Sequence, residues 1–352
     1  MAKQKLLNVE ALRGVAATLV VLYHVDKYYY DTPRLWAEKL FGGLFSFGHA
    51  GVEFFFVLSG FIIALIHAGD GGQPGKILPF LEKRFVRIYP FYWVCLAIVI
   101  VSMLVVPGVL SRISLDAVVG SIFLVGIDPF RSVVFVAWTL FHEVLFYAVF
   151  CLFIWNRKMG VAAIVAWSLG SYVLSFFGRY GYVVSPMNIL FIFGIGCALV
   201  LQRHRIPAPV AMAVAGSLGF LLIGLDDSFW HVVPRMIQIP AYGVASAAAL
   251  LGFVEMERSK GIHAGRLAVT IGQASYSIYL THMLTLTAMT KIAIKLKLAS
   301  LIPGSVAFLI FCVAALVGGV AIHRWVEKPL MAAARALLRR LRLAAPQKAV
   351  AG

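Results

Sequence analysis

Charged residues are scarce in this 352-residue chain. Asp, Glu, Lys and Arg together occupy 13% of the positions, about half of what a soluble domain carries. Apolar residues occupy 61%. A soluble globule of this length could not hide so much apolar surface, because polar groups must still cover its exterior. The composition therefore excludes an ordinary soluble domain and predicts an integral membrane protein.

Cysteine and the common nucleotide and hydrolase motifs are also rare or missing. The four cysteines fall inside apolar runs without CxxC spacing, so we expect small buried side chains, no disulfide framework and no metal site. The sequence has no P-loop, no GxGxxG fingerprint, no GxSxG turn and no HExxH pair. These absences give no support to a nucleotide-binding fold of those types or to a soluble-hydrolase triad.

Acidic residues are the scarcer of the two charged classes, which leaves a net charge of +16. A basic excess can indicate nucleic-acid binding, but only one basic run stands apart from the long apolar segments: Arg335, Arg339, Arg340 and Arg342. That run lies on an Ala- and Leu-rich stretch, which predicts an amphipathic helix on anionic lipid headgroups. We expect residues 331–352 to be a basic cytoplasmic tail with membrane lipid, and not nucleic acid, as its partner.

Long apolar runs are what the sequence has in abundance. Ten of them approach or exceed the length that a membrane-spanning helix needs, at 9–26, 49–67, 88–106, 133–154, 161–177, 187–201, 208–224, 236–254, 268–290 and 303–323. We expect an all-α, multi-pass transmembrane helical bundle of about ten spans. A shorter run, 118–126, predicts a re-entrant or interfacial segment that does not span.

The distribution of Lys and Arg predicts the orientation of the bundle. With ten spans both ends of the chain lie on one side, and placing them in the cytoplasm assigns twenty Lys and Arg to cytoplasmic segments and ten to outside segments. The positive-inside rule therefore predicts that both termini are cytoplasmic.

Arg13 and His24 are ionisable residues inside the first apolar run. An ionisable group at membrane depth costs about 2.5–3.5 kcal/mol on insertion scales, so its presence needs a reason. Eleven residues make close to three helical turns, so the two side chains share a face about 16 Å apart along the axis. A cation near the cytosol and an imidazole deeper on the same face suit an anionic ligand that enters from the cytosol. The alternative is a snorkelling Arg and a hydrogen-bonded packing His.

Three further ionisable groups could have either a chemical or a structural role. Glu143 needs a partner at membrane depth, and His24 is the natural candidate, because a carboxylate can fix the imidazole tautomer and raise its basicity. Glu143 could instead pair with Arg13 or a neighbouring His for folding alone. Arg84 and Arg87 lie three apart at the cytoplasmic start of a span and suit phosphate groups, although anchoring to lipid headgroups explains their spacing equally well.

Taken in chain order, these motifs resemble the acyltransferase-3 family of membrane O-acyltransferases. The segment from Glu10 to Ala17 with His24 is similar to the family's opening motif, a basic residue followed after ten positions by a His. Segments similar to its later motifs lie at 51–61, 84–90, 138–147, 274–282 and 326–329. The resemblance covers residues 1–330 and departs from the family at Glu53, where Asp is common.

The resemblance implies transfer of an acyl group, often acetyl, from cytosolic acyl-CoA to a hydroxyl of a carbohydrate acceptor. By length and by its Trp-Thr-Leu motif, the chain is most similar to stand-alone exopolysaccharide and O-antigen O-acetyltransferases. The resemblance also implies a multi-pass protein of the bacterial inner membrane that uses acetyl-CoA or another acyl-CoA as donor and needs no metal. A transporter or flippase with a proton relay is the rival class, and the lack of an inverted repeat counts against it.

The resemblance also suggests roles for individual residues. His24 would act as general base on the acceptor hydroxyl, oriented by Glu143 or Glu53, or would carry the acyl group itself. The CoA phosphates would be held by Arg84 and Arg87, and Arg13, the third residue expected to bind the donor, would line its path. The side chains expected to bind substrate are Trp138, Tyr147, Tyr279 and His282.

Overall fold

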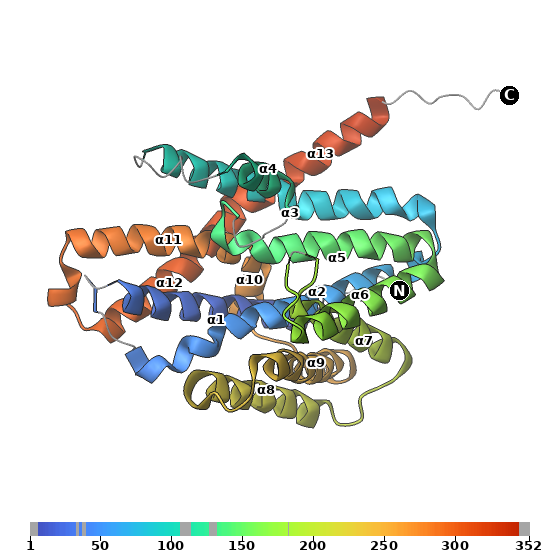
Figure 1. Ribbon diagram of the computed structural model, residues 1–352, viewed down its shortest axis with the longest axis horizontal. Coiled ribbons are helices and arrows are strands. Elements are labelled where there is room, and N and C mark those ends of the chain that lie inside the picture. Colours follow the sequence, from blue (N-terminus) through green and yellow to red (C-terminus); the bar gives the residue numbers. More distant parts are fainter. Residues whose placement is uncertain are drawn as a thin grey trace.

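The computed structural model describes residues 6–32, 35–36, 40–105, 114–126, 132–181 and 183–344 (Figure 1). This part of the chain is built from helices and turns and contains no β-strand, so the all-α prediction is confirmed. Its α-helices are α1 (Leu7–Asp31), α2 (Gly51–His67), α3 (Ile77–Val105), α4 (Leu115–Phe123), α5 (Trp138–Trp155), α6 (Arg157–Phe176), α7 (Ile189–Arg203), α8 (Pro209–Leu225), α9 (Arg235–Lys260), α10 (Arg266–Gln273), α11 (Ser275–Lys295), α12 (Gly304–Ile322) and α13 (Lys328–Ala344).

Eight helices of the described chain are long and apolar enough to cross a bilayer, which confirms a multi-pass helical bundle. α1 and α11 have 25 and 21 residues, about 38 and 32 Å at 1.5 Å per residue, so both are also long enough. These two helices are more polar than most of the other eight, because α1 carries five charged residues and α11 carries six Ser and Thr residues. The count of ten spans and the cytoplasmic position of the termini stay predictions.

The short run 118–126 contributes to α4, which has nine residues and is too short to cross a bilayer. A helix end leaves carbonyl groups without partners inside the helix. Here α3 supplies the donors: the side chains of Tyr89, Tyr92 and Trp93 donate to the carbonyl oxygens of residues 121–123 at 2.7–2.9 Å. These bonds give the last carbonyl groups of α4 protein partners, which a helix that ended at membrane depth would need.

α1 occupies the middle of the bundle and contacts α2, α9, α10, α11 and α12. In Figure 1, α3, α5 and α11 lie above it and α8 and α9 below it. Glycine allows the closest of these approaches: a Cβ atom on Gly272 of α10 would collide with the carbonyl oxygen of Glu10 in α1. This contact fixes the part of α1 that carries Arg13.

α13 follows α12 after a π-helical turn, His323–Glu327, and extends obliquely away from the bundle in Figure 1. It packs against α3. The basic tail predicted for residues 331–352 therefore begins as this helix. The Arg342 side chain and residues 345–352 lie outside the described part of the chain.

Candidate active site

One unbroken helix, α1, carries both Arg13 and His24, as their spacing predicted. The structure places a cavity beside each residue. Arg13 lines a cavity of about 540 Å³, and His24 lines another of about 1050 Å³. We call these the basic cavity and the histidine cavity, after the residues that distinguish them.

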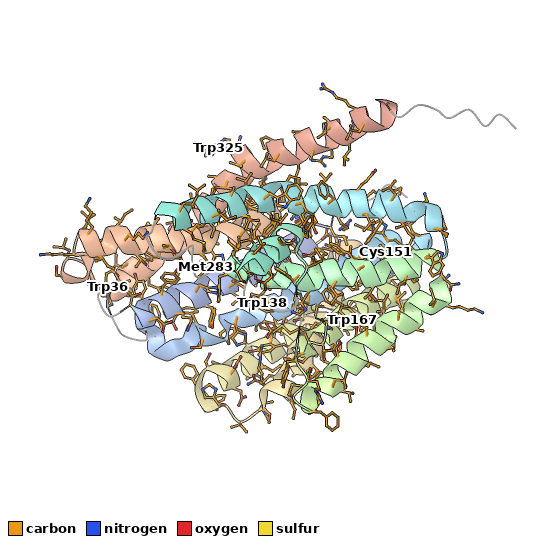
Figure 2. All side chains as sticks on the ribbon, turned by 45° about the horizontal axis from the view of Figure 1, so that its top comes forward. Trp36, Trp138, Cys151, Trp167, Met283 and Trp325 are labelled. Atoms are coloured by element: carbon orange, nitrogen blue, oxygen red, sulfur yellow. The ribbon has the colours of Figure 1, made fainter. Side chains whose placement is uncertain are left out.

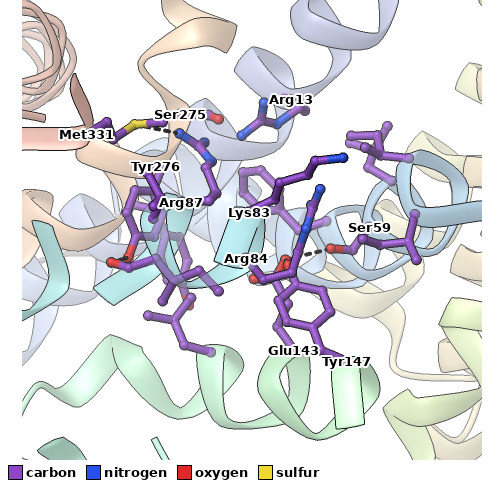
Figure 3. A pocket seen from close by; sticks show the side chains of 18 of the residues that line it. Arg13, Ser59, Lys83, Arg84, Arg87, Glu143, Tyr147, Ser275, Tyr276 and Met331 are labelled. Atoms are coloured by element: carbon purple, nitrogen blue, oxygen red, sulfur yellow. Dashed lines mark hydrogen bonds between the residues drawn. The ribbon is translucent and has the colours of Figure 1, made fainter. Parts of the chain in front are cut away.

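The basic cavity brings together three residues that the sequence assigned to one ligand, Arg13, Arg84 and Arg87 (Figure 3). Other lining residues come from α2, α5, α11 and α13. Two of the lining residues are Glu and six are basic: Arg13, Lys83, Arg84, Arg87, Arg335 and Arg339. The cavity therefore has a surplus of positive charge in its wall, and α13 contributes to it.

Glu143 lies in the wall of the basic cavity and not beside His24. Its carboxylate accepts hydrogen bonds from Ser59 Oγ at 2.8 Å and from the Tyr147 hydroxyl. The Arg84 guanidinium lies 5.8 Å from the centre of the Tyr147 ring, within the range of a cation–π contact. The structure thus brings Glu143 and Tyr147 to the arginines and places His24 in the other cavity.

Arg87 has a structural partner as well as a place in the cavity wall. Its Nη1 donates to Glu327 Oε1 at 2.5 Å. The same carboxylate accepts from Ser277 at 2.7 Å and from His323 Nδ1 at 2.6 Å. Glu327 is fully buried, so Arg87 balances a charge that would be costly to leave alone and ties α3 to the junction before α13.

The histidine cavity contains charges of both signs. Its lining includes Lys27, Asp31, Glu53, Arg235 and three histidines, His24, His49 and His142. Lys27 Nζ lies 3.0 Å from Asp31. Trp138 and Met283, both labelled in Figure 2, form part of its apolar wall. Trp138, predicted to bind substrate, therefore lines the same cavity as His24.

Glu53 belongs to an ion-pair cluster and not to a His24 pair. Its fully buried carboxylate binds the Arg235 guanidinium and lies 3.6 Å from His49 Nδ1. His49 Nε2 contacts Asp227 at 2.8 Å, and Arg235 lies 3.9 Å from the same carboxylate. Sequence reasoning missed His49, Asp227 and Arg235. Only the i, i+4 spacing of His49 and Glu53 could have suggested one of these pairs.

His24 is oriented by another histidine. His24 Nδ1 lies 2.9 Å from the Val20 carbonyl oxygen and 3.2 Å from His282 Nε2. His282 Nδ1 lies 3.1 Å from the Ile278 carbonyl oxygen. A carbonyl only accepts, so both Nδ1 atoms carry the proton in the neutral rings, and His282 Nε2 accepts from His24. This arrangement leaves His24 Nε2 unprotonated, as a general base requires.

Val52 and Tyr279 line both cavities and therefore form the boundary between them. The Tyr279 hydroxyl accepts from Thr139 and donates to the Val136 carbonyl oxygen, each at 2.9 Å. These bonds fix the ring at the start of α5. Tyr279 was predicted to bind substrate, and the structure places it where ligands in the two cavities would meet.

Comparison with known proteins identifies one family over most of the chain. The profile of the acyltransferase domain family, acyltransferase-3, matches residues 6–324. The exopolysaccharide production protein ExoZ of Rhizobium meliloti (strain 1021) is 29% identical over 320 residues, which cover 85% of this chain and 94% of ExoZ. The acyltransferase MdmB of Streptomyces mycarofaciens is 25% identical over 373 residues, 93% of this chain and 92% of MdmB.

A third relative matches over a shorter segment. The peptidoglycan O-acetyltransferase OatA of Listeria monocytogenes serovar 1/2a is 26% identical over 143 residues, which cover 40% of this chain and 19% of OatA. No solved structure matches the chain significantly.

Proposed function

Because the chain belongs to the acyltransferase-3 family, whose profile spans residues 6–324, we propose that it transfers an acyl group, acetyl above all, from cytosolic acyl-CoA to a carbohydrate hydroxyl. The proposed acceptor is an exopolysaccharide or a lipopolysaccharide, and the proposed location is the bacterial inner membrane. The relative ExoZ, named for exopolysaccharide production, supports this acceptor class because the match covers 94% of its length.

The charge of the basic cavity supports acyl-CoA as donor. All the phosphates of this molecule lie at its nucleotide end, away from the thioester. Arginine binds phosphate through paired, charge-assisted hydrogen bonds. Arg84 Nε is buried without a hydrogen-bond partner among the described residues, which is costly unless an anion engages it. The nucleotide end is therefore assigned to the basic cavity, with the thioester toward the boundary.

His24 is the proposed general base in the histidine cavity. Its Nε2 takes the proton of the acceptor hydroxyl as the oxygen attacks the thioester carbonyl carbon. The new C–O bond forms, the C–S bond breaks, and the proton returns to the CoA sulfur. A positioned base of this kind contributes about 10² to 10⁴ in rate. Transfer through an acyl group carried on His24 is the competing route.

One observation carries the proposal. A single helix presents Arg13 to a cavity lined by cations and His24 to a second cavity, and the two cavities meet at Val52 and Tyr279. A donor and an acceptor that approach from opposite sides would meet there.

The test is acetyl transfer from radiolabelled acetyl-CoA to cell glycan in membranes. Wild-type membranes should label the acceptor, and His24→Ala should lower the rate by at least about 10². His142→Ala is the control, because it removes another histidine of the same cavity. Near-normal transfer by His24→Ala would refute the assignment, and coupled uptake without acyl transfer would favour a transporter. Label on protein denatured at neutral pH before acceptor is added, and absent from His24→Ala, would identify the acyl-His24 route.

A further inference from the structure

The C-terminal helix α13 covers part of the basic cavity. Four of its residues line the cavity: Met331, Arg335, Leu338 and Arg339. They are spaced by four, three and one positions, so they form one stripe along the helix. The sequence predicted that the arginines of this segment bind lipid headgroups, whereas the structure places Arg335 and Arg339 in the wall of a cavity.

The start of α13 is held in place over the cavity. Arg87 Nη1 donates to Glu327, the residue directly before α13. The same Nη1 lies 3.9 Å from the sulfur of Met331, which is in the first turn of α13. Figure 3 shows Met331 and Arg87 side by side in the cavity wall. Because Glu327 is also bound by Ser277 and His323, the position of the helix is determined by buried contacts.

Arg335 and Arg339, the two arginines of α13 that line the cavity, differ from Arg13 and Arg87 in their charge partners. Arg13 is paired with Glu10 at 3.2 Å, and Arg87 with Glu327. Within the described chain, neither Arg335 nor Arg339 forms a salt bridge with a carboxylate. Their guanidinium groups are therefore available to an anion, as are Lys83 and Arg84, which also form no salt bridge within the described chain.

The other sides of α13 differ from the cavity stripe. Leu337 and Leu341 are more than half exposed, which suits contact with lipid at the membrane surface. Arg340 lies about 100° around the helix from Arg339 and about 140° from Arg335. It does not line the cavity and is a matched control on the same helix.

We propose that Arg335 and Arg339 form a phosphate-binding site at the outer end of the basic cavity, and that they bind the 3′-phosphate of the donor nucleotide. The inference rests on acyl-CoA being the donor. The thioester must lie nearest His24, so the nucleotide and its 3′-phosphate lie farthest from the boundary. α13, which supplies Arg335 and Arg339 to the cavity lining, extends away from the bundle in Figure 1.

The test compares binding of CoA and 3′-dephospho-CoA to the full-length protein in phosphatidylcholine nanodiscs. Wild type should prefer CoA by about tenfold or more, as expected for charge-assisted bonds to one phosphate. Arg335→Ala with Arg339→Ala should abolish that preference and leave binding of dephospho-CoA unchanged. Arg340→Ala should keep the wild-type preference.

The possible outcomes separate this inference from the proposed function. If wild type binds neither nucleotide, the proposed donor is wrong. If wild type prefers CoA and the double variant keeps that preference, only the α13 site is wrong. Equal weakening of both nucleotides would overturn the 3′-phosphate assignment. Loss of binding to phosphatidylglycerol vesicles with an intact CoA preference would assign these arginines to lipid headgroups.

Discussion

The two cavities differ in how their charges are compensated. In the basic cavity, six cations face two carboxylates, and Arg335 and Arg339 have no salt bridge within the described chain. In the histidine cavity, Lys27 is paired with Asp31, and Glu53 with Arg235. The difference suggests that one cavity is built to attract an anion and the other to hold an uncharged ligand beside a base.

This contrast also separates two uses of buried carboxylates. Glu53 and Glu327 each neutralise an arginine, so they hold helices together. Glu143 accepts hydrogen bonds from Ser59 and Tyr147 in the wall of the basic cavity, beside Arg84. Similar residues at membrane depth can therefore serve packing or a ligand, and only their partners distinguish the two.

The largest expected effect concerns the ion pair in the histidine cavity. Arg235→Gln should lower the free energy of unfolding by about 2–3 kcal/mol, because the fully buried Glu53 loses its arginine and keeps only His49 as a basic partner. Thermal unfolding of purified protein measures this. Glu53→Gln together with Arg235→Gln should recover part of the loss. Lys27→Gln, in a half-exposed pair, should cost at most about 1 kcal/mol. A larger loss for Lys27 would contradict the comparison.

The next effect tests whether His282 positions the base. His282→Leu should lower kcat roughly tenfold to a hundredfold and leave KM for acetyl-CoA unchanged, because His24 Nδ1 keeps the Val20 carbonyl oxygen but loses the second acceptor that orients the ring. His282→Gln should retain more activity, since its side-chain oxygen can accept that hydrogen bond. If the Leu and Gln variants were equally impaired, or KM rose with the fall in kcat, His282 would have a different role.

A smaller effect is expected from the basic cavity. Arg84→Ala should raise KM for acetyl-CoA about tenfold with little change in kcat, because the lost contact is to the remote nucleotide end. Lys158→Ala removes an exposed cation from α6, outside the cavity, and is the control. A fall in kcat at unchanged KM would place Arg84 at the reacting end instead.

The smallest effect concerns the boundary itself. Val52→Ala should raise kcat/KM for butyryl-CoA relative to acetyl-CoA by about fivefold, because a smaller side chain between the cavities admits a longer acyl group. Val57→Ala makes the same change on α2 at a buried position that lines neither cavity. An equal shift in both variants would show a general loosening of α2.

The sequence predicted features that lie along one helix and missed most of the contacts between helices. The common face of Arg13 and His24 follows from helical spacing, and α1 has it. The partner of Glu53 lies 182 positions away, and the partner of His24 lies 258 positions away. Spacing gives no access to such contacts, because many polar groups could reach a buried carboxylate or imidazole. The placement of α13 over the cavity depends likewise on the buried Glu327 contacts.

The boundary at Val52 and Tyr279 has an electrical consequence. With the orientation predicted from the Lys and Arg distribution, the two cavities would open from opposite sides of the membrane and would reduce its insulating thickness to this pair of side chains, so most of the membrane voltage would fall across them. A proton passing inward from His24 to the CoA sulfur would cross that drop. Its work would be up to about 2.3 kcal/mol per 100 mV. Acyl transfer in proteoliposomes with an imposed potassium potential should therefore speed up when the interior, facing the donor, is negative.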